Sequence, residues 1–385
     1  HFNNQLFLSK EEKEPKIIST LGDNVLDFTP EDEMNIGKYK AEKNNKALYI
    51  LLFVKVNEYL GQNMTVFQND LDDYVKLLLN LDYDSNGVIA ELSKINIDNF
   101  TQGVEIMGWF HQYYNTDVFN KLYDGDMSKK KISSKYLPVA TQLYTPDWVV
   151  KYMVENTLGR VWVDHLIGNG ETEKAENFIN KWQYYIKDTD EDNPELKKIR
   201  EKRKDLKPTD IKFIDPCMGS GHILVYAFEL LVDIYCNEGY SQSDSALLIV
   251  ENNLYGLDID DRAYQLAYFA VMMKARSYDR RILTRDIKPN VYSIKESNFL
   301  ADSWQKISDD EKFREIIQTV VDTFIDAKEY GSILNVPDAD YDYALSVIDD
   351  FEQSVPVDFE AQILRGKTDD IRALVNQAKL LSQKY

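Results

Sequence analysis

Two short stretches of the sequence place acidic residues and glycines where a ligand could be held. The first is DPCMGSGH, residues 215–222, which lies between an apolar run and a long apolar segment. Glycines between a strand and a helix let backbone N–H groups and the positive end of the helix approach a ligand closely. A tight turn also needs glycine merely for positive φ, so a purely structural role of this turn stays open.

The residues around this turn narrow the type of ligand. No Gly-Lys-Ser/Thr follows it, which disfavours a phosphate loop, and Leu224 stands where the dinucleotide-binding fingerprint has its third glycine. Asp215 places a carboxylate at the end of the expected strand. The sequence therefore favours a cationic or hydroxyl-rich ligand over a pyrophosphate.

The second stretch is LYGLDID, residues 254–260, an apolar run that ends in acids. In doubly wound folds an acid at the end of the second strand accepts hydrogen bonds from ribose hydroxyls, which is the role expected of Asp258. Ile259 beside it could pack on an adenine face. The separation of 37 residues between Gly221 and Asp258 exceeds the ~20 typical of a nicotinamide cofactor. Local capping is the alternative role of Asp258, although Asp260 and Asp261 can serve as caps as well.

A third candidate is the pair Thr145 and Pro146, which precedes an apolar helical segment. A threonine followed by proline is a helix-start signal, because the side chain caps the helix and the missing N–H of proline costs nothing at the first helical position. We expect Thr145 to be this cap. Capping alone would account for both residues.

The elements that must position these residues differ between the two ends of the chain. Residues 1–137 are predicted to form a helical N-terminal domain, since apolar residues recur every three or four positions over residues 47–60, 70–81 and 105–114. A polar connection at residues 129–135 leads to the boundary near Leu137.

Strands and helices alternate over residues 138–300, with a charged helical insertion over about 164–210. Strands are expected at residues 213–214, 254–260 and 290–294, with helices at residues 222–237, 242–251 and 261–277. This order predicts parallel βαβ units and an α/β fold. Residues 301–385 are predicted to be helical and acidic, without an obvious fourth strand.

Composition limits the possible partners. The net charge is −20, and residues 301–385 hold 18 acidic against 9 basic residues, so we expect the chain alone to bind DNA poorly. Basic islands at residues 129–135, 195–212 and 276–288 have solvated helix faces as their alternative explanation. Two cysteines, Cys217 and Cys236, fit a reducing cytosol and argue against a disulfide framework or structural zinc. No apolar run reaches the ~20 residues of a membrane span.

The order of these motifs resembles a known family. Tyr-Thr-Pro ahead of a helix, Asp-Pro-x-x-Gly-Ser-Gly-His, Leu-Asp-Ile-Asp and Asn-Phe-Leu are similar to the S-adenosylmethionine-binding half of amino-directed DNA adenine methyltransferases. GWFHQYYN at residues 108–115 and DAKEYGSIL at residues 326–334 resemble the methyltransferase subunit of BREX phage-defence systems. The resemblance is specific over residues 105–300 and loose before residue 100.

The resemblance implies a Rossmann-like methyltransferase core with S-adenosylmethionine as cofactor. It implies that Thr145 and the backbone of residues 219–221 hold the methionine end, that Asp215 holds the amino group, and that Asp258 binds the ribose hydroxyls. It also implies that Ile259 and Phe299 border the adenine. The implied cofactor-binding set is Thr145, Pro146, Asp215, Pro216, Gly219, Ser220, Gly221, Asp258, Ile259, Asn298 and Phe299.

Within this set, Asn298 corresponds to a position that contacts the amino group of the cofactor's adenine, which an Asn carbonyl can do by accepting a hydrogen bond. For the full-length protein the resemblance implies a cytoplasmic enzyme that methylates adenine in double-stranded DNA. Other defence-system proteins are possible partners.

One departure from the family concerns catalysis. Its Asn/Asp-Pro-Pro-aromatic motif, which holds the flipped base, is absent, and the nearest tripeptides at residues 193–195 and 215–217 lack the second proline and the aromatic. No catalytic residue is therefore assigned in this chain. The sequence ends at LLSQKY, where the family begins the strand leading to that motif, so we interpret the chain as part of a longer polypeptide that is inactive alone.

Two alternatives stay open. One is a methyltransferase that acts on a small molecule, RNA or protein and is complete as it stands, although the missing strands argue against it. The other is a non-catalytic, cofactor-binding assembly module, for which the acidic surface and the absent motif would be native features.

Overall fold

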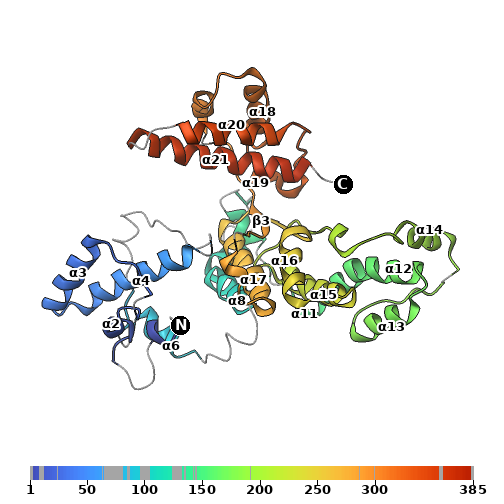
Figure 1. Ribbon diagram of the computed structural model, residues 1–385, viewed down its shortest axis with the longest axis horizontal. Helices are drawn as coiled ribbons and strands as arrows, with labels where there is room; N and C mark the ends of the chain where they lie inside the picture. The colour runs from blue at the N-terminus through green and yellow to red at the C-terminus, as the bar shows by residue number, and fades with distance from the viewer. Residues whose placement is uncertain are drawn as a thin grey trace. The chain divides into compact units, whose positions relative to one another are not determined.

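The structure is a computed structural model, and it forms two compact units, His1–Ile106 with Arg280–Ile287, and Met107–Asp279 with Lys288–Tyr385 (Figure 1). It describes residues 3–7, 13–23, 25–62, 64, 81–84, 87–95, 105–123, 132–133, 136–141, 143, 145–190, 192–285, 287–298, 300–354 and 359–382. Residues 70–80 of the predicted helix over residues 70–81, and most of the connection at residues 129–135, lie outside these ranges. The domain boundaries near residues 137 and 300 stay predictions.

The first unit is helical in its described part. Its main helices are α2 (Ile17–Thr20), α3 (Pro30–Ala41), α4 (Asn45–Gly61) and α6 (Val88–Ser93), with the short α1 (Asn3–Leu6) and a 3-10 turn at Ile282–Thr284. Leu48, Tyr49, Leu52 and Val56 of α4 are buried in one core cluster, at the helical spacing that the sequence showed. The predicted helix over residues 47–60 is confirmed.

The second unit contains a small parallel sheet of β1 (Phe213–Asp215), β2 (Leu254–Asp258) and β3 (Asn290–Ser293), in the order β1-β2-β3. Phe213 pairs with Leu254, and Tyr255 pairs with Asn290. The predicted parallel arrangement is confirmed within a structure that is mostly helical. The second strand ends two residues earlier than predicted, because Asp260 caps the next helix by accepting a hydrogen bond from the N–H of Arg262.

Three helices follow the first two strands: α15 (His222–Asn237), α16 (Gln242–Asn252) and α17 (Asp261–Tyr278). They confirm the predicted helices, and α15 packs against both of the others. Gly256 allows β2 to approach this layer, since a Cβ there would lie 2.5 Å from the sulfur of Met218 and 2.8 Å from a methyl carbon of Leu224. Packing, rather than turn geometry, therefore requires this glycine.

A helical segment precedes the sheet in the chain. It consists of α11 (Asp147–Val154), a π-helical turn (Glu155–Gly159), α12 (Arg160–Gly168), α13 (Thr172–Lys181) and α14 (Pro194–Lys202). The buried carboxylate of Glu155 accepts hydrogen bonds from the N–H of Tyr184 at 2.7 Å and the hydroxyl of Tyr226 at 2.8 Å. These bonds fix the insertion to α15.

The basic island at residues 195–212 is partly internal to this insertion. Asp164 is buried and pairs with Arg200 at 3.2 Å and Arg203 at 2.6 Å. Lys197 and Lys204 pair with nearby acids on the surface. Because several of its charges are already balanced, the island offers less positive charge to a polyanion than its sequence suggested.

The remaining helices of the second unit lie before and after these elements in the chain. Those before are α8 (Glu105–Tyr114), α9 (Thr116–Tyr123) and α10 (Leu137–Ala140), and those after are α18 (Glu311–Thr323), α19 (Ala327–Tyr330), α20 (Tyr341–Ser354) and α21 (Phe359–Ser382). Short 3-10 turns at Ala301–Lys306 and Gly331–Ile333 lie among the latter. Leu257 of β2 and Ile294 after β3 belong to the same core cluster as Phe313, Phe324 and Leu374. In the described part of the chain, no helix is long and apolar enough to cross a membrane.

Candidate functional site

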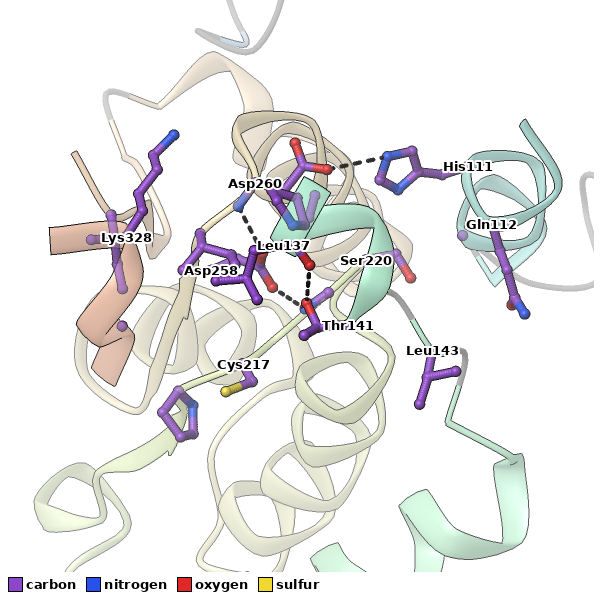
Figure 2. Close-up of a pocket in the computed structure, with 18 of the residues that line it drawn as sticks. His111, Gln112, Leu137, Thr141, Leu143, Cys217, Ser220, Asp258, Asp260 and Lys328 are labelled. Atoms are coloured by element: carbon purple, nitrogen blue, oxygen red, sulfur yellow. Dashed lines mark hydrogen bonds and ion pairs between the residues drawn. The ribbon is translucent and has the colours of Figure 1, made fainter. Parts of the chain in front are cut away.

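A cavity of about 310 Å³ opens beside the carboxyl ends of β1 and β2 in the second unit (Figure 2). Five stretches of the chain line it: residues 108–112, 137–143, 216–220, 258–263 and 328–331, together with Ile294. Ligands of open parallel sheets bind at this edge of the strands. The cavity is therefore the candidate site.

The expected site residues divide into two groups. Five of them line the cavity, namely Pro216, Gly219, Ser220, Asp258 and Ile259. Thr145, Pro146, Asp215, Gly221 and Asn298 are described but are not among the lining residues, and Phe299 lies outside the described residues. The structure thus brings the turn after β1 to the end of β2, while the ligand contacts of all eleven residues stay predictions.

Asp258 is held by main-chain donors from two directions. One carboxylate oxygen accepts the N–H of Gly219 at 2.8 Å, and the other accepts the N–H of Asp260 at 2.9 Å. The N–H of Met218 also donates to the carbonyl of Leu257 at 2.9 Å. Burial raises the pKa of Asp258, although its backbone hydrogen bonds act in the opposite direction. The cap of α17 is Asp260, so helix capping does not account for Asp258.

The two glycines of the turn are required for different reasons. Both have positive φ, +52° at Gly219 and +84° at Gly221. A Cβ on Gly219 would meet no described atom within 4 Å, whereas a Cβ on Gly221 would lie 3.0 Å from the Cα of Ala267 in α17. Gly221 therefore permits close packing of the helix layer, and Gly219 leaves open space at the cavity.

Asp215 lies at the end of β1 with only 6% of its surface exposed. One carboxylate oxygen accepts the N–H of Cys217 at 3.1 Å, and the other has no hydrogen-bond partner among the described residues. Burial raises the pKa of Asp215 to about 6, and the negative charge of Asp258 acts in the same direction. A buried carboxylate in this state needs a cation or a hydrogen-bond donor to complete its surroundings.

Thr145 does not have the capping role predicted for it, while its predicted contact with the cofactor stays a prediction. The helix α11 begins at Asp147 with Pro146 at the cap position, and within the described chain no side chain caps it, so the prediction that Thr145 caps this helix is wrong. The carbonyl of Thr145 instead lies 3.2 Å from Nδ1 of His222 in α15. This long-range contact joins the start of α11 to the helix that follows the glycine turn.

Asn298 is bound to a residue of the distant DAKEYGSIL stretch. Its amide donates to the carboxylate of Asp326 at 2.6 Å, and its carbonyl accepts the N–H of Asp326 at 2.9 Å. Asp326 has φ of +52°, a conformation uncommon outside glycine. Asn298 therefore holds the turn from which α19 begins.

Sequence reasoning assigned no role to three stretches that line the cavity. One is residues 137–143, and the other two come from α8 and α19. His111 and Gln112 come from α8, and residues 328–331 come from the end of α19. Nε2 of His111 lies 3.5 Å from the carboxylate of Asp260. Burial lowers the pKa of His111, and the charge of Asp260 opposes this change. The stretches from α8 and α19 carry the family resemblance, and that was the signal that could have marked them.

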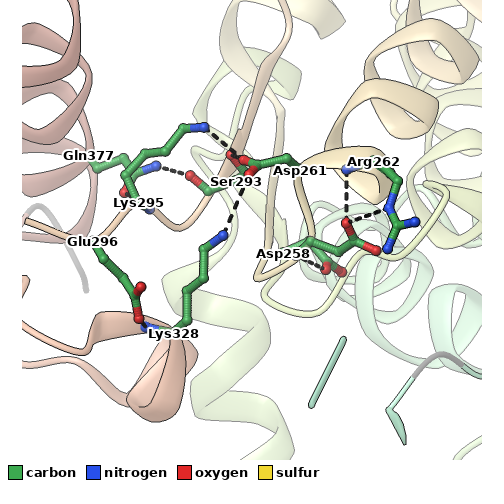
Figure 3. Close-up of polar contacts among 9 residues, drawn as sticks. Asp258, Asp261, Arg262, Ser293, Lys295, Glu296, Lys328 and Gln377 are labelled. Carbon is green, nitrogen blue, oxygen red and sulfur yellow. Dashed lines mark hydrogen bonds and ion pairs between the residues drawn. The ribbon is translucent and has the colours of Figure 1, made fainter. Parts of the chain in front are cut away.

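A polar network fixes the wall made by residues 328–331 (Figure 3). Asp261 accepts a hydrogen bond from Ser293 at 2.5 Å and pairs with Lys295 at 2.7 Å and Lys328 at 3.5 Å. Burial acts to raise the pKa of Asp261, but these hydrogen bonds and positive charges outweigh it and lower the pKa. Gln377 of α21 also donates to the carbonyl of Ser293 and accepts the N–H of Lys295. The network joins α17, β3, α19 and α21.

Comparison with known proteins identifies relatives, although no protein-family model matches the sequence. The chain is 36% identical over 348 residues to the adenine-specific methyltransferase PglX of Lacticaseibacillus casei (strain Zhang), a match covering 88% of this chain and 28% of the relative. It is 32% identical to the adenine-specific methyltransferase BrxX of Escherichia coli O9:H4 (strain HS), over 92% of this chain and 30% of the relative. A putative type II restriction enzyme and methyltransferase of Methanocaldococcus jannaschii is 29% identical over 56% of the chain. The chain spans under a third of the length of these relatives.

Proposed function

This chain is homologous to the adenine-specific methyltransferases PglX and BrxX, and from that premise we propose that it is the cofactor-binding part of a site-specific DNA adenine N6-methyltransferase. The complete protein transfers a methyl group to adenine in double-stranded DNA as part of a phage-defence system of the BREX type. The cofactor is S-adenosylmethionine. The three-stranded sheet belongs to a Rossmann-like methyltransferase core.

The residues at the cavity fit this cofactor. S-adenosylmethionine carries a sulfonium, an ammonium group, ribose hydroxyls and an adenine, and a cavity of about 310 Å³ is within the range of sites for small ligands. Asp215 does not line the cavity, but it directly precedes Pro216, which does, and its unpartnered oxygen suits an ammonium group. The open space at Gly219 lets a ligand approach the main chain. When bound, the cofactor supplies a methyl group activated by the positive charge on sulfur.

The observation that carries this proposal is the fixed carboxylate of Asp258 at the cavity. Gly219 and Asp260 orient it through their N–H groups, and Ile259 beside it offers an apolar surface in the same cavity. Asp258 would accept hydrogen bonds from the ribose hydroxyls, and Ile259 would contact the adenine. An acid followed by an apolar residue at the end of the second strand supports a nucleoside ligand.

Calorimetry with S-adenosylhomocysteine tests the proposal. We expect the folded chain to bind this ligand and Asp258→Ala to weaken binding by ~1–3 kcal/mol, the effect of losing a charged hydrogen-bond acceptor. Asp192→Ala is the matched control, because that carboxylate is 95% exposed and remote in sequence from the site. Absence of binding by the folded wild type would contradict the proposal.

The cysteines offer a second measurement that locates the bound ligand. Cys217 is exposed and lines the cavity, whereas Cys236 lies on α15 and is half-buried. In a Cys236→Ser variant, S-adenosylhomocysteine at ~100 times its Kd should slow the reaction of Cys217 with a thiol reagent by about 100-fold, because the free fraction falls by that factor. An unchanged rate at a saturating concentration would place the ligand elsewhere.

The alternative acceptors are a small molecule, RNA or protein. The names of two relatives give adenine as the target, and the restriction enzyme among the relatives favours DNA as the acceptor. The negative charge of this chain supports a DNA contact made by other parts of the complete protein. Transfer of labelled methyl groups by this chain and by a longer chain, each offered an adenine-containing duplex, separates these acceptors. Transfer by this chain alone would contradict the assignment of a cofactor-binding part.

A further inference from the structure

Tyr330 lines the cavity from the end of α19, while 57% of its surface is exposed. Tyr330 is thus a large aromatic residue with exposed surface available to a ligand in this cavity. Ile259 lines the same cavity from the end of β2. An aromatic and an aliphatic side chain are thus available to one ligand from two separate elements.

The backbone that carries Tyr330 is firmly anchored. Ala327 is fully buried in the core cluster, Asn298 holds Asp326 by two hydrogen bonds, and the N–H of Lys328 donates to Glu296 at 3.3 Å. Gly331 follows with φ of +59° and ψ of −137°, a conformation open essentially to glycine alone. The exposed ring therefore projects from a rigid support rather than from a loose loop.

We propose that Tyr330 stacks on the purine of the bound nucleoside and that Asn298 is the positioning residue that keeps it there. This inference rests on the proposed function and adds a ligand-binding residue to the same site. Every base presents a π-face, and stacking on an aromatic side chain is a general means of holding it. The contribution of Asn298 passes through Asp326 and α19, since both polar ends of its side chain are bound to Asp326.

Calorimetry with S-adenosylhomocysteine on single variants tests the stacking. Tyr330→Ala should weaken binding by roughly 5- to 150-fold, the range that removal of a stacked ring produces, while Tyr330→Phe should bind within about 2-fold of the wild type. Ile333→Ala is the matched control, because Ile333 is 80% exposed in the next turn and does not line the cavity. A Kd for Tyr330→Ala equal to that of the wild type would overturn the inference alone. No binding by the folded wild type would overturn the proposed function, and the inference with it.

A double-mutant cycle tests the positioning role. If Asn298 acts through Tyr330, Asn298→Ala should weaken binding in the wild type but add little to Tyr330→Ala, because coupled residues have non-additive effects. Repeating the cycle with the analogue in which hypoxanthine replaces adenine separates this role from direct contact. A positioning effect persists with that analogue, whereas an effect that vanishes with the loss of the amino group would show direct contact and overturn the role given to Asn298.

Discussion

Asp215→Asn is expected to raise the free energy of unfolding of the ligand-free protein at neutral pH while weakening its binding of S-adenosylhomocysteine. Burial raises the pKa of Asp215 from 3.8 to about 6, so the ionised carboxylate is less stable in the folded state than in the unfolded chain. The shift of about 2 units corresponds to roughly 3 kcal/mol. Asparagine carries no charge and keeps an oxygen for the N–H of Cys217.

The difference in free energy of unfolding between Asp215→Asn and the wild type should depend on pH. Below pH 3.8 the carboxyl is protonated in both states, so the two proteins should differ little in stability there. Between pH 3.8 and about 6 the unfolded chain ionises Asp215 while the folded wild type keeps the proton, so the wild type loses stability relative to the variant over this range, and the difference is constant above it. Urea unfolding of both proteins between pH 4 and pH 8 measures the difference. A difference that stays constant over this range would contradict the role of ionisation.

Binding of the ligand should respond in the opposite sense. The ammonium group of S-adenosylhomocysteine favours the ionised form of Asp215, so wild-type affinity should fall as pH drops through about 6. In Asp215→Asn, the binding free energy should be weaker by ~1.5–3 kcal/mol at pH 8. The affinity of the variant should change little with pH around 6, because asparagine does not ionise. Asp192→Asn, on an exposed side chain, should leave both stability and affinity unchanged. Equal affinity of the variant and the wild type at pH 8 would show that Asp215 does not contact the ligand.

Alanine substitutions at the two glycines of the turn should have different main effects, one on stability and the other on ligand affinity. Gly221→Ala should lower the free energy of unfolding by ~2–4 kcal/mol, since positive φ disfavours alanine and its Cβ would lie 3.0 Å from the backbone of Ala267. Gly219→Ala should lower it by only ~1 kcal/mol, because its Cβ would enter open space. The methyl group at Gly219 would instead occupy space that the ligand needs. Its main effect should therefore be on affinity.

Chemical denaturation and calorimetry of both variants test this separation. Gly239→Ala is a suitable control for the conformational term alone, since Gly239 also has positive φ, +90°, and a Cβ there would meet no described atom within 4 Å. If Gly221→Ala and Gly239→Ala lower the free energy of unfolding by the same amount, the close approach of Gly221 to α17 contributes nothing to stability. Unchanged affinity of Gly219→Ala would show that the ligand stays away from this part of the turn.

Local patterns in the sequence were sufficient to predict the strands and the helices around them. The first two strands are short, mainly apolar runs, and each helix between strands carries its apolar residues at helical spacing, so neither needed knowledge of distant contacts. The error in strand length concerns Ile259 and Asp260, which the pattern included in the strand; the expectation that Asp260 caps the next helix is confirmed. Boundaries of this kind depend on one hydrogen bond, which periodicity does not encode.

Site residues could be predicted from the sequence only where they lie at the end of a strand that the apolar pattern predicts. Asp258 ends β2 and Gly219 lies in the turn after β1, and their positions at the sheet edge were expected. Thr145 was misread as a cap, because its contact with His222 spans 77 residues and leaves no local trace. Tyr330 reaches the cavity from a short helix far along the chain, so only the fold could show that it lies near Ile259.

The two hydrogen bonds to Asp258 have a consequence for the entropy of ligand binding. A free aspartate side chain must lose rotational freedom when it binds a hydroxyl pair, and that loss reduces affinity. In this protein the N–H groups of Gly219 and Asp260 already fix the carboxylate, so the freedom is lost during folding and not again on binding. The acceptor is preorganised, so its affinity for the ribose diol that we propose it binds depends on these main-chain donors as well as on the carboxylate itself.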